Sequence, residues 1–83
     1  MYTRKEFGKE LKQIIINKKT TEQIGGWVYW IYMKHIQDID SEFRGLLLDL
    51  STMEDGPEFA LSYERLNDIA DRLIAGESVK LYP

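Results

Sequence analysis

The sequence predicts an all-α protein, an antiparallel four-helix bundle formed by a single domain over residues 1–83. Apolar residues recur three and four positions apart in four separate segments, which is the spacing of a buried helical stripe. Residues that favour helix N-caps precede these segments, and the connections between them are short. A chain of 83 residues has room for one small core, so we expect no second domain.

The first helix is expected to begin after Thr3, because Glu6 three residues later suits a capping box. Its buried stripe has the spacing i, i+4, i+7, i+8 and consists of Phe7, Leu11, Ile14 and Ile15. Asn17 is a suitable place for this helix to end.

A second helix is expected from about Glu22 to Gln37, with Thr20 or Thr21 as its N-cap. Residues 25–33 hold both tryptophans and two of the five tyrosines. That composition also favours a β-strand, and a glycine inside a helix costs about 1 kcal/mol relative to alanine. The alternative is therefore an α+β fold with residues 26–33 as a strand. We prefer the helix because no comparable segment could pair with such a strand.

The two faces of this second helix are expected to differ. The face towards the core should carry Ile24, Trp27, Val28 and Ile31. The sides should carry Tyr29, Trp30 and Met33. A helix that is apolar nearly all round lies at the centre of its bundle or covers a partner. Gly25 and Gly26 would let another helix approach closely.

The third helix is expected to start at a cap formed by Asp40 or Ser41. Its apolar stripe consists of Phe43, Leu46, Leu47, Leu50 and Met53. Asp55-Gly56-Pro57 should end it, because glycine permits a left-handed C-terminal residue and proline cannot continue a helix. In the connection that follows, Phe59 and Leu61 are expected to pack against the end of the bundle.

Ser62 is expected to cap a fourth helix, and Gly76 should end it. The buried stripe of this helix consists of Leu66, Ile69, Ala70, Leu73 and Ile74. In the tail from Glu77 to Pro83, either Val79 and Leu81 dock on the bundle or the end frays.

The composition excludes several classes of site. The chain has no cysteine, which removes disulfides, thiolate zinc sites and cysteine nucleophiles and fits a reducing compartment. No run approaches the roughly 20 apolar residues of a membrane span, and Lys9 and Lys12 interrupt any apolar signal region. We therefore expect a cytoplasmic protein that makes no membrane contact.

The sequence contains no recognisable catalytic, cofactor-binding or metal site, so we expect a protein that is not an enzyme and needs no cofactor. His35 is the only histidine, and a general base also needs a nucleophile and an orienting group beside it. The acidic run from Asp38 has a calcium-loop spacing. Its sixth position is Phe43 instead of glycine, however, and its last is Asp49 instead of glutamate.

Charge is distributed unevenly along the chain. Residues 1–37 carry seven basic and three acidic side chains, whereas residues 38–83 carry four basic and eleven acidic ones. Either the two halves pack together and neutralise each other, or the asymmetry marks a surface for a charged partner.

We predict that the partner is another protein, and a basic one. Acidic side chains attract a basic partner and speed encounter, and Tyr and Trp are frequent anchors of interfaces. The predicted partner-binding residues are Glu64, Asp68 and Asp71 on the fourth helix, Glu54, Asp55 and Glu58 at the preceding turn, and Tyr29 and Trp30. The alternative is that the acidic residues serve solubility alone.

Between residues 7 and 75 the order of helices resembles that of small bacterial immunity proteins, which protect cells from bacteriocins and other toxins. The resemblance is carried by a short helix before Thr20-Thr21-Glu22-Gln23-Ile24, by Trp27, by the leucine-rich segment 43–50, and by the segments 62–66 and 69–74. It implies tight, non-catalytic binding of a basic toxin, often a nuclease.

Two other functions are compatible with the same sequence. One is a structural homodimer in which the second helix covers its twin, since large exposed aromatic faces are usually covered. The other is a nucleic-acid-associated regulator, whose first helix would present Lys5, Lys9 and Lys12 to phosphates. The interleaved Glu6 and Glu10 and the acidic net charge favour a protein partner over a nucleic acid.

Overall fold

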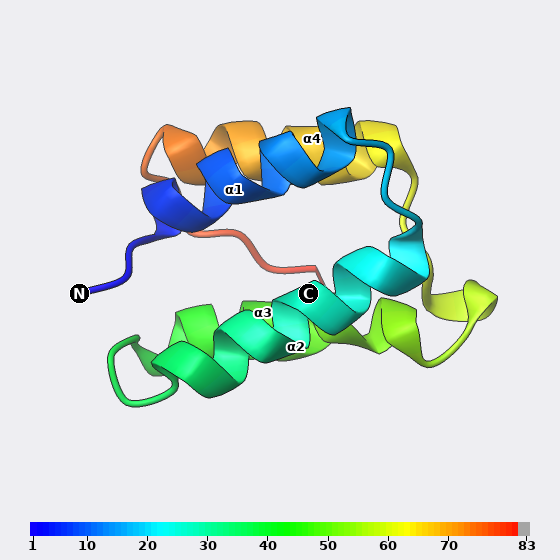
Figure 1. The fold of residues 1–83 in the computed structure, drawn as a ribbon. Helices are drawn as coiled ribbons and strands as arrows, with labels where there is room; N and C mark the ends of the chain where they lie inside the picture. Colours follow the sequence, from blue (N-terminus) through cyan, green and yellow to red (C-terminus); the bar gives the residue numbers. More distant parts are fainter. Residues whose placement is uncertain (82–83) are drawn as a thin grey trace.

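The computed structural model describes residues 1–81 and consists of α-helices joined by short connections (Figure 1). The four helices are α1 (Arg4–Ile16), α2 (Thr21–His35), α3 (Ser41–Ser51) and α4 (Tyr63–Ile74). Two 3₁₀ turns, η1 (Thr52–Glu54) and η2 (Pro57–Phe59), lead from α3 to α4. Successive helices run in opposite directions, so the predicted antiparallel all-α bundle is confirmed.

The helices form two layers. α1 packs against α4 in one layer, and α2 packs against α3 in the other (Figure 1). The tail after Gly76 runs between the layers, where Val79 is buried and Leu81 packs partly against the core. Of the two outcomes predicted for the tail, docking is therefore confirmed for Val79 and Leu81; Tyr82 and Pro83 lie outside the described residues.

Both N-caps in the first part of the chain lie where the sequence places them. The Thr3 hydroxyl accepts a hydrogen bond from the Glu6 N–H at 3.1 Å. The full capping box forms at Thr20 instead: its hydroxyl accepts from the Gln23 N–H, and the Gln23 side chain accepts from the Thr20 N–H. At Thr3 the Glu6 carboxylate accepts a hydrogen bond from the threonine hydroxyl and not from the Thr3 N–H.

The later helices are capped in the same way. Asp40, and not Ser41, caps α3 by accepting from the Phe43 N–H at 2.8 Å. Ser62 caps α4 by accepting from the Arg65 N–H at 3.0 Å. Each cap satisfies an N–H group that has no partner inside its helix.

The strand alternative for residues 26–33 is wrong, because α2 is continuous from Thr21 to His35. Burial along this helix follows the helical period: Ile24, Val28 and Ile31 are each at most 1% exposed. The tight cap at Thr20 and this apolar face outweigh the strand preference of the aromatic residues. The helix ends two residues earlier than expected, in a turn over residues 36–38.

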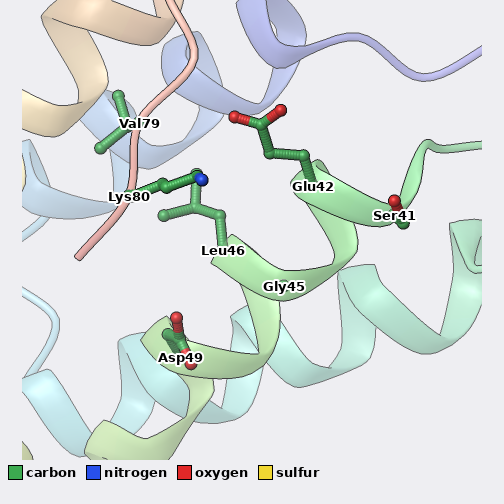
Figure 2. Close-up of a pocket in the computed structure, with 7 residues that line it drawn as sticks. All are labelled: Ser41, Glu42, Gly45, Leu46, Asp49, Val79 and Lys80. Atoms are coloured by element: carbon green, nitrogen blue, oxygen red, sulfur yellow. The ribbon is translucent and has the colours of Figure 1, made fainter. Parts of the chain in front are cut away.

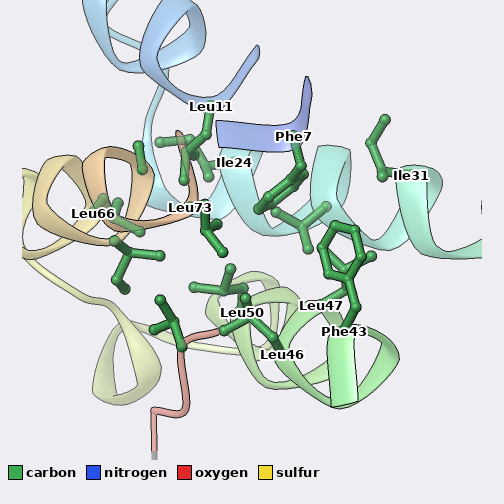
Figure 3. Packing of buried hydrophobic residues seen from close by; sticks show 14 of the residues in the cluster. Phe7, Leu11, Ile24, Ile31, Phe43, Leu46, Leu47, Leu50, Leu66 and Leu73 are labelled. Carbon is green, nitrogen blue, oxygen red and sulfur yellow. The ribbon is translucent and has the colours of Figure 1, made fainter. Parts of the chain in front are cut away.

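The core lies between the two layers and receives side chains from every helix (Figure 3). Fully buried side chains include Phe7 and Leu11 of α1, Ile24 of α2, Leu47 of α3 and Leu66 of α4, which point towards one another. Within residues 1–81 no charged side chain is buried. Hydrophobic burial is therefore the main stabilising contribution.

Two glycines allow backbone segments to approach closely. A Cβ on Gly25 would lie 2.5 Å from the backbone nitrogen of Glu54 in η1. A Cβ on Gly8 would lie 2.8 Å from the carbonyl oxygen of Ala70 in α4. The expectation that Gly25 and Gly26 let another helix approach closely is confirmed only in part, because a 3₁₀ turn and not a helix approaches, and it approaches Gly25 and not Gly26.

The turn between α3 and α4 differs from the expectation. Gly56 has φ 166° and ψ 159°, so it is extended and not left-handed. The reason is that η1 prolongs α3 by a tighter turn, after which Pro57 starts η2. Leu61 packs partly against the core as expected, but Phe59 is 43% exposed, so that part of the prediction is wrong.

Left-handed residues occur at two helix ends. Gly76 has φ 88° after α4, which confirms its role as a C-terminal stop. Lys18 has φ 59° after α1, where the sequence offers no glycine.

In residues 1–81 no helix combines the length and the apolar character that crossing a bilayer requires.

Gly25→Ala is expected to destabilise the protein by about 1–3 kcal/mol, because its methyl group would overlap the η1 backbone. Gly45→Ala is the matched control, since nothing lies within 4 Å of its Cβ position in α3. The control should gain up to about 1 kcal/mol from helix propensity. Urea unfolding followed by circular dichroism measures both changes, and a midpoint that rises for Gly25→Ala would contradict the close approach.

Candidate functional site

The outer face of α2 exposes large apolar side chains. Tyr29 is 45% exposed, Trp30 55% and Met33 54%. Together with Gly26 they have the spacing i, i+3, i+4, i+7, which places them on one side of the helix. We call these four residues the α2 stripe. It includes Tyr29 and Trp30, which the sequence predicted as anchors, and adds Gly26 and Met33.

The inner face of α2 is complete without the stripe. Ile24, Val28 and Ile31 are buried in the core, and the Trp27 ring stacks on Phe7 with 5.3 Å between ring centroids. The stripe residues therefore add little to the core, and their apolar surface faces water. Exposed aromatic surface on a small domain commonly marks an interaction site.

Neighbouring side chains hold the stripe aromatics in place. The Lys34 ammonium lies 4.7 Å from the centroid of the Trp30 ring, within the range of a cation–π interaction. The centroids of the Tyr29 and Tyr32 rings lie 6.1 Å apart. Both contacts restrict rings that would otherwise rotate freely, which reduces the entropy lost when a partner binds.

Gly26 has no role inside the fold that would explain it. A Cβ at this position would meet only the carboxylate of Glu54, at 3.4 Å, whereas the Gly25 position collides with backbone. A glycine inside a helix costs about 1 kcal/mol relative to alanine. The missing side chain at Gly26 therefore leaves a hollow in the stripe that is bordered by the Glu54 carboxylate, at a cost to stability that no internal contact requires.

The two ends of the stripe differ in charge. Glu22 and Glu54 line one pocket at the N-terminal end of α2. Lys34 and His35 occupy the last turn of the same helix. Both arrangements suit the helix dipole, which is positive at the N-terminus and negative at the C-terminus.

The acidic residues predicted on α4 are engaged within the protein. Asp68 accepts hydrogen bonds from Arg65 at 3.3 Å and from Arg72 at 3.0 Å. Asp71 forms an ion pair with Lys12 of α1. Glu64 is exposed and takes part in no ion pair within residues 1–81. The role of these three residues in binding stays a prediction, with Asp68 and Asp71 already neutralised.

The acidic residues at the α3–α4 connection are in a different position. Glu54, Asp55 and Glu58 are exposed, and none of them forms an ion pair in the part of the chain that the structure describes. At the opposite end of α3, Asp38 and Asp40 bind the N-terminal amino group and Arg4. Among residues 1–81, the acidic end at residues 54–58 has no ion pair, whereas at the other end Asp38 and Asp40 are paired and Glu42 is not.

The basic face of α1 is also partly compensated. Lys12 is paired with Asp71, while Lys5 and Lys9 are exposed. The pairing removes one of the three lysines that would contact phosphates in a nucleic-acid regulator.

An N-terminal arm, which sequence analysis missed, packs across one end of the bundle. The Tyr2 ring stacks on His35, with centroids 4.1 Å apart and planes at 8°. The Tyr2 hydroxyl donates to Glu10 at 3.1 Å, and its N–H donates to Asp38 at 2.8 Å. Burial, followed by the Glu10 charge, raises the pKa of Tyr2. The signal for this arm is an aromatic residue directly before an N-cap, where apolar residues often pack on the helix.

Several hollows lie away from the stripe, two of them beside α3 and α2. One of about 350 Å³ lies between α3 and the tail and is lined by Glu42, Asp49 and Lys80 among others (Figure 2). The other, of about 190 Å³, is formed by Ile14, Gln23, Trp27 and Lys19. Within residues 1–81 no group of three His, Asp or Glu side chains could hold a metal ion.

No family model, curated protein or solved structure matches this chain. The resemblance to immunity proteins therefore stays a prediction from the sequence pattern. Within the part of the chain that the structure describes, the α2 stripe is the feature that the fold explains least.

The ion pair between Arg4 and Asp40 predicts a pH dependence of stability. Both terminal nitrogens of the Arg4 guanidinium contact the Asp40 carboxylate, at 2.9 and 3.0 Å, and together with the Phe43 N–H they lower the pKa of Asp40 to about 2. A carboxyl group with a lowered pKa stabilises the fold above its unfolded pKa of about 3.9, and this contribution is lost as pH falls towards 2.

Asp40→Asn keeps an N-cap residue but removes the charge. We expect it to lose less than about 1 kcal/mol near pH 6, since the pair is exposed, and to match the parent protein near pH 2. Urea midpoints at the two pH values measure this. Glu64→Gln is the control, and a difference for Asp40→Asn that persists at low pH would contradict the ion-pair explanation.

Proposed function

We propose that the protein is a non-catalytic binding module that engages a partner protein through the α2 stripe. The observation that carries this proposal is the exposure of Tyr29, Trp30 and Met33 on a helix whose opposite face already completes the core. Tyr and Trp dominate interface hot spots, and Met is enriched at interfaces because it adapts its shape.

The charged surroundings of the stripe support the same function. Interfaces combine an apolar centre with a polar rim that excludes water and sets the register. Here Glu22 and Glu54 lie at one end of the apolar residues and Lys34 at the other. A partner would thus find an apolar centre between two rims of opposite charge.

Trp30→Ala is expected to abolish capture of the partner when the tagged protein is incubated with a lysate of its source organism. A hot-spot tryptophan contributes about 2 kcal/mol or more, which corresponds to at least roughly thirtyfold in affinity. Ile16→Ala is the matched control, since Ile16 is 66% exposed on α1 and lies off the stripe. Quantitative mass spectrometry compares the captured proteins, and equal recovery by Trp30→Ala and the parent protein would refute the proposal.

A second candidate is binding of a basic protein at the acidic end of the α3–α4 connection, and neutralisation of a basic toxin is its most specific form. Glu54, Asp55 and Glu58 keep uncompensated charge there, unlike Asp68 and Asp71. Electrostatic complementarity of this kind speeds association and suppresses unsuitable partners.

Replacing Asp55 and Glu58 by lysine is expected to slow association with a captured basic protein by at least roughly tenfold at low salt, with a smaller effect at high salt. Stopped-flow or surface-based kinetics measure the rate. The same replacement of Asp68 and Asp71 is the comparison, and an equal effect at both places would contradict a site confined to residues 54–58.

A further inference from the structure

We propose that the partner of the α2 stripe is a second copy of this chain, whose own α2 packs antiparallel against the first across a two-fold axis near Tyr29 and Trp30. This inference rests on the proposed function of the stripe as a binding surface. It goes further by naming the occupant and the register of the contact.

The shape of the stripe is complementary to itself. Gly26 has no side chain, which leaves a hollow beside the Glu54 carboxylate, and Met33 is an apolar side chain that is 54% exposed. The two residues are seven positions apart, about 10.5 Å or two helical turns along the same face. In an antiparallel pair centred between residues 29 and 30, Met33 of each copy lies opposite Gly26 of the other. Both hollows are filled at once, as a two-fold interface requires.

The hollow also explains a glycine that the monomer does not need. A Cβ at Gly26 would make only an ordinary contact with the Glu54 side chain. Gly25, directly before it, is required by the η1 backbone. Of these two adjacent glycines, one therefore serves the fold, and the other serves a close approach from outside the fold.

Charge favours the antiparallel arrangement over the parallel one. The N-terminal end of the stripe carries Glu22 and Glu54, and the C-terminal end carries Lys34. Antiparallel pairing brings the acidic end of each copy to the basic end of the other. It also aligns the helix dipoles favourably, whereas parallel pairing would place like charges together.

The area of the stripe predicts a weak dimer. About half of each stripe side chain is exposed, and an aromatic residue can bury roughly 150–250 Å² in total. The stripe alone thus offers less than the roughly 800 Å² per partner of a standard interface. We expect a dissociation constant weaker than about 1 μM, so that monomer and dimer exchange.

Sedimentation equilibrium of the full chain over a concentration series up to about 1 mM tests the proposal. The parent protein is expected to show a monomer–dimer equilibrium. Gly26→Ala should weaken dimerisation at least tenfold while raising the urea midpoint of the monomer. Gly45→Ala should raise the midpoint in the same way and leave dimerisation unchanged, because Gly45 lies on α3 and off the stripe.

A double-mutant cycle tests the register. If Met33 occupies the hollow at Gly26 of the other copy, Met33→Ala alone weakens the dimer, and Gly26→Ala then costs less in the Met33→Ala background than in the parent protein. Additive effects, or equal effects of Gly26→Ala and Gly45→Ala on dimerisation, would overturn the proposed packing.

The outcomes separate this inference from the proposed function. A chain that stays monomeric at about 1 mM, while Trp30→Ala still abolishes capture from the lysate, overturns self-pairing and leaves the stripe as a site for another protein. A monomeric chain with unchanged capture by Trp30→Ala overturns both.

Discussion

The contact between Gly25 and the backbone of η1 sets the rotation of α2 about its axis, and the rest of the structure depends on that rotation. With Gly25 against η1, Ile24, Val28 and Ile31 point into the core. The same rotation turns Tyr29 and Trp30 to the outside, so one backbone contact decides both what the core contains and what the surface exposes. The contact is between main chains, and any side chain at residue 25 would prevent it.

Charges reinforce the packing of segments that are far apart in the sequence. Arg4 binds Asp40, Lys12 binds Asp71, and the N-terminal amino group approaches Asp38. Each of these pairs joins the basic first half of the chain to the acidic second half. Exposed pairs contribute little energy individually. Their main effect is to neutralise part of the charge asymmetry between the two halves, while residues 54–58 and the two ends of the α2 stripe keep local charge contrasts.

Features that depend on nearby residues could be predicted from the sequence, and features that depend on distant ones could not. The caps at Thr3, Thr20, Asp40 and Ser62 and the inner face of α2 follow from local spacing. The pairing of Asp68 with Arg65 and Arg72 also follows from local spacing, since these residues are three and four positions apart on one helix. The Lys12–Asp71 pair, the Tyr2 arm and the extended Gly56 depend on tertiary contacts that spacing does not reveal. For the candidate site, the sequence predicted Tyr29 and Trp30, whereas the difference between Gly25 and Gly26 depends on the position of η1.

The two tryptophans, three residues apart on α2, are natural spectroscopic probes of two different events. Trp27 is stacked on Phe7 of α1, so its emission should change when the two layers of the bundle come together. Trp30 lies on the surface beside Lys34, so its emission should respond to whatever covers the stripe. Replacing one indole at a time would let folding and association be followed separately by intrinsic fluorescence, without attaching a dye to a domain this small.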